Sequence, residues 1–144
     1  MKIEIYEGLQ EDSDQDEKED HKTMTESEKG DIRRKIRDDS IYTDPRYVKW
    51  RDKVFERDRF TCQLSGDAGG HLEAHHIVSK WKYPERIFDL SNGITLRKYM
   101  HEYVHKKGAE KFEEKFFQLA KTNKAKKRMK KVVYKLRMFK GGKR

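Results

Sequence analysis

The sequence predicts an α+β fold in which two short strands precede a helix. Ile77-Val78 and Ile94-Thr95-Leu96 are short, apolar and rich in β-branched residues, as is typical of strands. Residues 97–107 contain neither Pro nor Gly, and Gly108 follows them, so they are expected to form a helix that ends there. The 144 residues suffice for one domain with tails.

A further helix is predicted before the strands. Asp44 and Pro45 suit its start, because Asp can cap the first turn and Pro is tolerated at the first helical position. Residues 46–57 then place aromatic and apolar side chains on one stripe, which indicates a core-facing helix. Five basic residues are expected to face outward, either toward phosphates or into solvent: Arg46, Lys49, Arg51, Lys53 and Arg57.

The two ends of the chain carry opposite charge. Residues 1–30 hold four Lys and eleven Asp or Glu, and residues 1–40 are expected to be a largely disordered acidic segment, with 31–40 either a short helix or a linker. Residues 106–144 hold sixteen basic and three acidic residues. Within them, 109–120 and 124–140 have helical patterns separated by a break at Thr122-Asn123, so 109–144 is predicted to be a basic helical extension.

Composition excludes several protein classes. No apolar run approaches the ~18 residues of a membrane span, and no apolar leader is evident, so we expect a cytoplasmic protein. The single cysteine excludes an internal disulfide and fits a reducing compartment. A basic amphipathic segment can serve a membrane surface or a partner protein as well as phosphates.

Four of the six histidines fall between residues 72 and 107. His75 and His76 are adjacent in the first apolar run, and His101 and His105 are four apart in the predicted helix, on one face of it. If the strands pack on that helix, His75 or His76 could complete a three-imidazole metal site. Glu73 shares a strand face with His75, where it could orient a ligand histidine or remain a surface carboxylate.

The stretch from Tyr47 to Gly108 resembles the HNH endonucleases, also called ββα-metal or His-Me finger nucleases. The resemblance lies in a His-His pair ending the first strand, an Asn opening the second, and a helical His nine residues after that Asn, with another His four residues on. It implies that residues 41–108 are a ββα-metal module. It further implies that the chain is a metal-dependent DNA endonuclease that hydrolyses phosphodiester bonds. Phe88–Leu96 is also similar to phage-borne HNH homing endonucleases.

The resemblance assigns roles residue by residue. His76 would be the general base, His75 and His101 metal ligands, and His105 a third ligand. Asn92 would shape the loop around the base rather than touch the metal. One divalent ion is expected, Mg²⁺ or Mn²⁺ in preference to Zn²⁺ or Ni²⁺.

Many relatives also hold a structural zinc with two CxxC pairs. The corresponding positions here are Cys62, Ser65, Arg97 and Met100, and one thiolate cannot build that site. We therefore expect no structural zinc and a buried Cys62 that acts as a small apolar residue.

Double-stranded DNA is the expected partner, and a homodimer is left open. The alternative hypothesis is a nucleic-acid-binding or DNA-packaging accessory protein whose HNH module is structural or needs a complex. In either case, the residues expected at phosphates are Arg86, Lys124, Lys126, Lys127, Arg128, Lys130, Lys131, Lys135 and Arg137.

Overall fold

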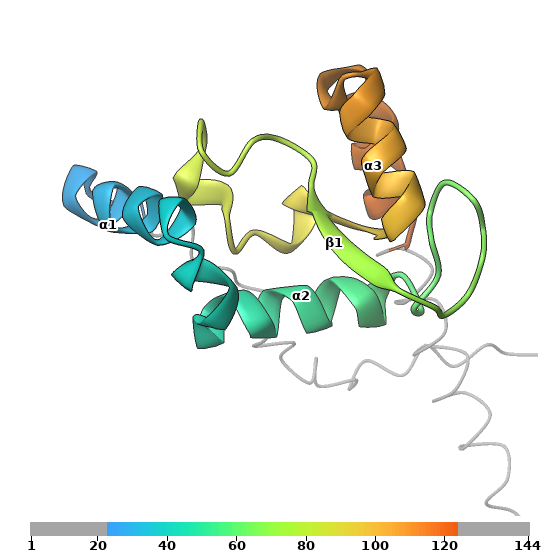
Figure 1. Ribbon diagram of the computed structural model, residues 1–144, viewed down its shortest axis with the longest axis horizontal. Helices are drawn as coiled ribbons and strands as arrows, with labels where there is room; N and C mark the ends of the chain where they lie inside the picture. The colour runs from blue at the N-terminus through green and yellow to red at the C-terminus, as the bar shows by residue number, and fades with distance from the viewer. Residues whose placement is uncertain (1–22, 124–144) are drawn as a thin grey trace, which may run out of the picture.

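The computed structural model describes residues 23–123. Helix α1 (Glu26–Arg37) and helix α2 (Pro45–Arg57) come first, followed by strand β1 (Leu72–His76), strand β2 (Gly93–Arg97) and helix α3 (Lys98–Lys107). Residues 113–123 are helical as well. The two-stranded sheet lies between α2 and α3, and α1 packs beside the loop that joins the strands (Figure 1). This is the expected α+β fold.

Strands β1 and β2 pair antiparallel, with His75 opposite Ile94 and His76 opposite Gly93. Successive residues of a strand point to opposite faces of the sheet. His75 therefore faces α3 and His76 faces α2, so the adjacent histidines enter different surroundings. The strand prediction at Ile77-Val78 was displaced, because β1 ends at His76. Ile77 still donates its backbone N–H to the carbonyl of Asn92, at 2.9 Å.

Two apolar clusters hold the sheet in place. Toward α3, the buried residues are Cys62, Ile77, Ile94, Leu96, Val104, Phe116 and Ala120. Toward α2, they are Ile32, Ile41, Tyr47, Trp50, Val54 and Ile87. The complete burial of Cys62 agrees with its expected role as a small apolar residue.

Helix α2 approaches β2 more closely than any side chain at Gly93 would allow. A Cβ atom there would lie 2.5 Å from Val54 Cγ2 and 2.7 Å from Trp50 Cζ2. The helix begins as predicted, with Asp44 accepting a hydrogen bond from the Arg46 backbone N–H and Pro45 in its first turn. Glycine at position 93 thus allows the close spacing between α2 and β2, at the residue that lies opposite His76.

Helix α1 corrects the prediction of disorder for residues 26–30. Thr25 and Glu28 form a capping box, in which each side chain accepts a hydrogen bond from the other residue's backbone N–H. Ile32 is buried in the cluster toward α2, so the helix gains tertiary packing as well as a cap.

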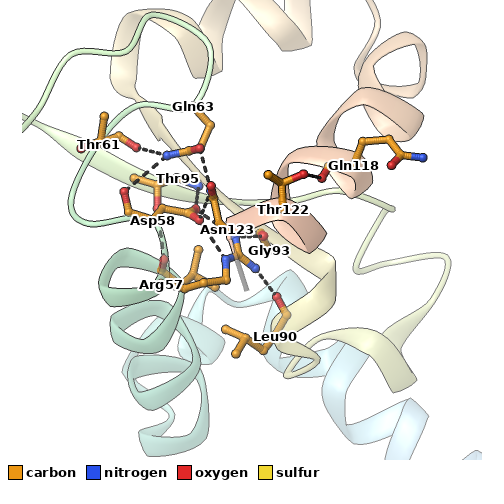
Figure 2. A network of polar contacts seen from close by, with 11 residues as sticks. Arg57, Asp58, Thr61, Gln63, Leu90, Gly93, Thr95, Gln118, Thr122 and Asn123 are labelled. Carbon is orange, nitrogen blue, oxygen red and sulfur yellow. Dashed lines mark hydrogen bonds and ion pairs between the residues drawn. The ribbon is translucent and has the colours of Figure 1, made fainter. Parts of the chain in front are cut away.

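Arg57 was predicted to face outward, and this was wrong. Arg57 and Asp58 form an ion pair at 2.8 Å, with side chains 3% and 0% exposed. The guanidinium also donates to the carbonyls of Leu90 and Gly93, at 2.8 and 2.7 Å. Figure 2 shows the pair at the centre of a network that reaches Thr95 and Asn123.

The carboxylate of Asp58 connects α2 to two other parts of the chain. It accepts hydrogen bonds from the backbone N–H of Thr95 and from the side-chain amide of Asn123, both at 2.9 Å (Figure 2). The predicted break at Thr122-Asn123 was wrong, because both residues continue the helix that starts at residue 113. The predicted helix over 124–140 lies outside the described residues.

Candidate metal centre

Three imidazole rings meet where β1 packs on α3. His75 comes from the strand, and His101 and His105 lie one turn apart on the helix. One nitrogen atom from each ring lies within 4.8 Å of the others. The Nε2 atoms of His101 and His105 are 3.1 Å apart. This is the set of residues expected as metal ligands, brought together by one strand and two successive turns of one helix.

Glu73 orients one of these rings. Its Oε2 atom lies 2.5 Å from His101 Nδ1. Because a carboxylate can only accept, Nδ1 carries the hydrogen and the lone pair of His101 is on Nε2, the atom that faces His105. A carboxylate that fixes the tautomer of a ligand histidine is a common partner of metal sites. Glu73 therefore contacts His101 and would influence a bound metal only through that ring.

His75 supplies the observation that best fits a bound cation. It is 3% exposed, and its Nε2 is buried with no hydrogen-bond partner among the described residues. Burial, and then the charges of His101 and His105, lower the pKa of His75 to about 3. The ring is thus neutral at pH 7, with a buried nitrogen whose lone pair or hydrogen is unsatisfied. Such an atom is costly unless something binds it, and neutral imidazole is a metal ligand.

His76 occupies the opposite face of the strand. Its Nε2–H donates to the carbonyl of Ile87, at 2.9 Å, and its ring stacks on Trp50 with centroids 4.1 Å apart. The hydrogen bond fixes the tautomer, because a carbonyl only accepts, and it leaves the lone pair on Nδ1. Burial lowers the pKa of His76 to about 4, partly opposed by the Ile87 hydrogen bond. The ring is therefore unprotonated at neutral pH.

Asn92 holds the loop that carries this carbonyl. It is fully buried; its Oδ1 accepts from the Val78 backbone N–H at 2.9 Å, and its Nδ2 donates to the Arg86 carbonyl at 3.1 Å. These bonds join both ends of the loop between the strands. Arg86 directly precedes Ile87, so Asn92 acts on His76 through the loop backbone and does not reach the imidazole cluster.

Of the residues expected at phosphates, the structure describes only Arg86. Arg86 forms an ion pair with Asp89 at 3.2 Å, and its guanidinium lies over the ring of Phe117. Its phosphate contact therefore stays a prediction. The others lie outside the described residues: Lys124, Lys126, Lys127, Arg128, Lys130, Lys131, Lys135 and Arg137.

Sequence reasoning did not find two parts of this site. Trp50 was predicted as a core residue, and it is one, but its stacking on His76 was not foreseen. The Ile87 carbonyl gives no signal in the sequence, since any residue would offer the same backbone atom. Only the adjacency of His76 to a loop could have suggested a backbone partner.

Comparison with known proteins gives one match. Residues 62–106 match a protein-family model described as HNH endonuclease. The matched stretch contains β1, the loop, β2 and all but the last residue of α3, and it includes every imidazole discussed above. No curated protein and no solved structure matched the chain. Within residues 23–123, no helix is long and apolar enough to cross a membrane.

Proposed function

We propose, from the match of residues 62–106 to a family model of HNH endonucleases, that this chain is a metal-dependent DNA endonuclease. The observation that carries the proposal is the approach of three imidazole nitrogens, from His75, His101 and His105, to within 4.8 Å. The net charge of +9 supports a polyanionic substrate.

The three imidazoles would hold one divalent cation. When bound, it supplies positive charge that stabilises negative charge developing on the phosphate and on the departing oxygen. Neutral ligands leave that charge undiminished. Imidazole by itself favours Zn²⁺ or Ni²⁺. We favour Mg²⁺ or Mn²⁺ because water and phosphate oxygens would fill the remaining positions.

His76 would take the proton from the attacking water. Its Nε2–H is held by Ile87, so Nδ1 is the accepting atom. The water oxygen then bonds to phosphorus as the bond to the 3′ oxygen breaks, which leaves a 5′-phosphate and a 3′-hydroxyl, as the family resemblance implies. Because His75 and His76 point to opposite faces, the phosphodiester is expected to cross the end of β1, where both faces can be reached.

The narrower assignment, a phage-borne homing enzyme acting on double-stranded DNA, is part of the same proposal. It rests on the similarity of Phe88–Leu96 to such enzymes and on the excess of basic residues. In this enzyme, Asn92 would hold the loop between the strands in place, and Glu73 would hold the His101 ring in its orientation.

Cleavage of supercoiled plasmid with a panel of divalent metals tests the proposal. His76→Ala should lower the cleavage rate by about 10²–10⁴-fold, as expected for loss of a general base, while DNA binding is retained. His21→Ala is the matched control, since His21 lies far before the histidine motif in the sequence. Undiminished cleavage by His76→Ala would remove the assigned base. If the wild-type chain binds DNA but does not cut it with any of the metals tested, the accessory-protein hypothesis is favoured.

A further inference from the structure

The loop that follows β1 presents aromatic rings and lysines in alternation. Lys80, Trp81, Lys82 and Tyr83 are consecutive, and Trp81 and Tyr83 are 48% and 38% exposed. Tyr42, 45% exposed, joins them, because Lys80 Nζ lies 4.6 Å from its ring centroid and donates to its hydroxyl at 2.8 Å. We call these five residues the aromatic–lysine surface. Isolated exposed aromatics are ordinary, but three interleaved with two cations are a patch with a chemical character.

The backbone under this surface is held in place. The Tyr83 N–H donates to the Ser79 carbonyl at 2.9 Å, which closes a turn around Trp81. Arg33 of α1 donates its Nε–H to the Trp81 carbonyl at 3.3 Å. The next residue, Pro84, is buried. The rings are therefore mounted on a fixed loop, which lowers the entropic cost of binding through them.

A row of rings connects this surface to the candidate base. His76 lies 6.0 Å from Tyr47, and Tyr47 lies 5.3 Å from Tyr42, centroid to centroid. Lys80 lies over the Tyr42 ring at the end of this row that is farther from His76. A strand held at the aromatic–lysine surface would thus pass close to the end of β1.

We propose that the aromatic–lysine surface stacks on unpaired bases, so that the protein engages double-stranded DNA at positions where the two strands are locally separated. This rests on the proposed function. Inside a duplex, both faces of each base are covered by its neighbours, so exposed rings gain little from it. On an unpaired strand, each base offers a free face for Trp81, Tyr83 or Tyr42, and the phosphates between the bases meet the lysines. Interleaved rings and cations match that repeat.

Binding without metal tests this independently of cleavage. The full chain is titrated, in the presence of EDTA, against one labelled oligonucleotide as a single strand and as a duplex. Trp81→Ala and Tyr83→Ala should each weaken single-strand binding by about fivefold to a hundredfold, the usual loss for one stacked base, with a smaller effect on the duplex. Trp81→Phe keeps a ring and should restore most of the affinity.

Tyr99→Ala is the matched control, because Tyr99 is 50% exposed on α3 and outside the surface. It should leave both affinities unchanged. Single-strand binding unaffected by Trp81→Ala would overturn the proposal, as would an equal loss on the duplex or in Tyr99→Ala. If the aromatic–lysine surface proves not to bind single strands but the protein cleaves plasmid, only the stacking proposal fails. If the protein prefers single strands through this surface but does not cleave, only the nuclease function fails.

Discussion

Asp58→Asn should destabilise the fold strongly, although it changes one atom. The carboxylate accepts hydrogen bonds from Arg57, from the Thr95 backbone and from Asn123. Asn offers one acceptor oxygen and turns an NH₂ group toward these donors. It also leaves the Arg57 charge buried without its counter-charge. Breaking one side of a buried pair costs about 3–5 kcal/mol. Domains of this size are stable by about 5–15 kcal/mol, so much of the total is at stake.

Urea denaturation at neutral pH measures the effect. Asp52→Asn is the matched control, because Asp52 also pairs with the arginine beside it in the sequence, Arg51, but with side chains 54% and 40% exposed. Exposed pairs contribute about 0–1 kcal/mol, so the control should unfold close to the wild-type midpoint. If Asp58→Asn lowered the free energy of unfolding no more than Asp52→Asn does, the buried pair would not have the stabilising role assigned to it.

Three further predictions concern the sheet and the imidazoles. Gly93→Ala should destabilise by about 1–3 kcal/mol through overpacking against α2, whereas Gly30→Ala, with open space around it in α1, should stabilise by about 0.5–1 kcal/mol; thermal unfolding that ranks them the other way would contradict the packing. In the folded protein, His75 and His76 have pKa values of about 3 and about 4, below the ordinary 6.5. Between these low values and pH 6.5, the unfolded chain therefore binds more protons than the folded one. Without metal, stability should therefore fall as pH drops from 6.5 to 4, by up to about 1.4 kcal/mol per pH unit for each ring, and denaturation curves of equal midpoint at pH 7 and pH 5 would exclude this burial. Glu73→Gln should weaken metal binding by about 10–100-fold, because His101 loses the carboxylate that orients it. An unchanged affinity in calorimetric titration would show that Glu73 does not support the metal site.

Local patterns predicted the elements around the site. Asp44-Pro45 correctly predicted the start of α2, and Gly108 correctly predicted the end of α3. The four-residue spacing of His101 and His105 placed both on one face of α3. Strand alternation then explains why neighbouring histidines can have different tasks. Which of His75 and His76 faces α3 depends on the register of the hairpin and on where the helices pack, and the sequence pattern alone left that choice open.

The errors came from two sources. The capping signal at Thr25 and Glu28 was present in the sequence, but the surrounding charge outweighed it in the prediction of disorder. Arg57 is different, because it lies seven residues after Trp50 and three after Val54, on the buried stripe of α2, and only the folded hairpin reveals the carbonyls of Leu90 and Gly93 that accept its hydrogen bonds. Burial of a charge depends on partners distant in sequence, which a periodic pattern does not show.

Calorimetric titration of the full chain with Zn²⁺ tests most directly whether three imidazoles form one cation site. The wild type is predicted to have one tight site, which is lost or greatly weakened in His75→Ala, His101→Ala and His105→Ala and preserved in His21→Ala and His76→Ala. Zn²⁺ binding that survives the loss of both His75 and His101, or that depends equally on His21, would contradict a site built from these three imidazoles.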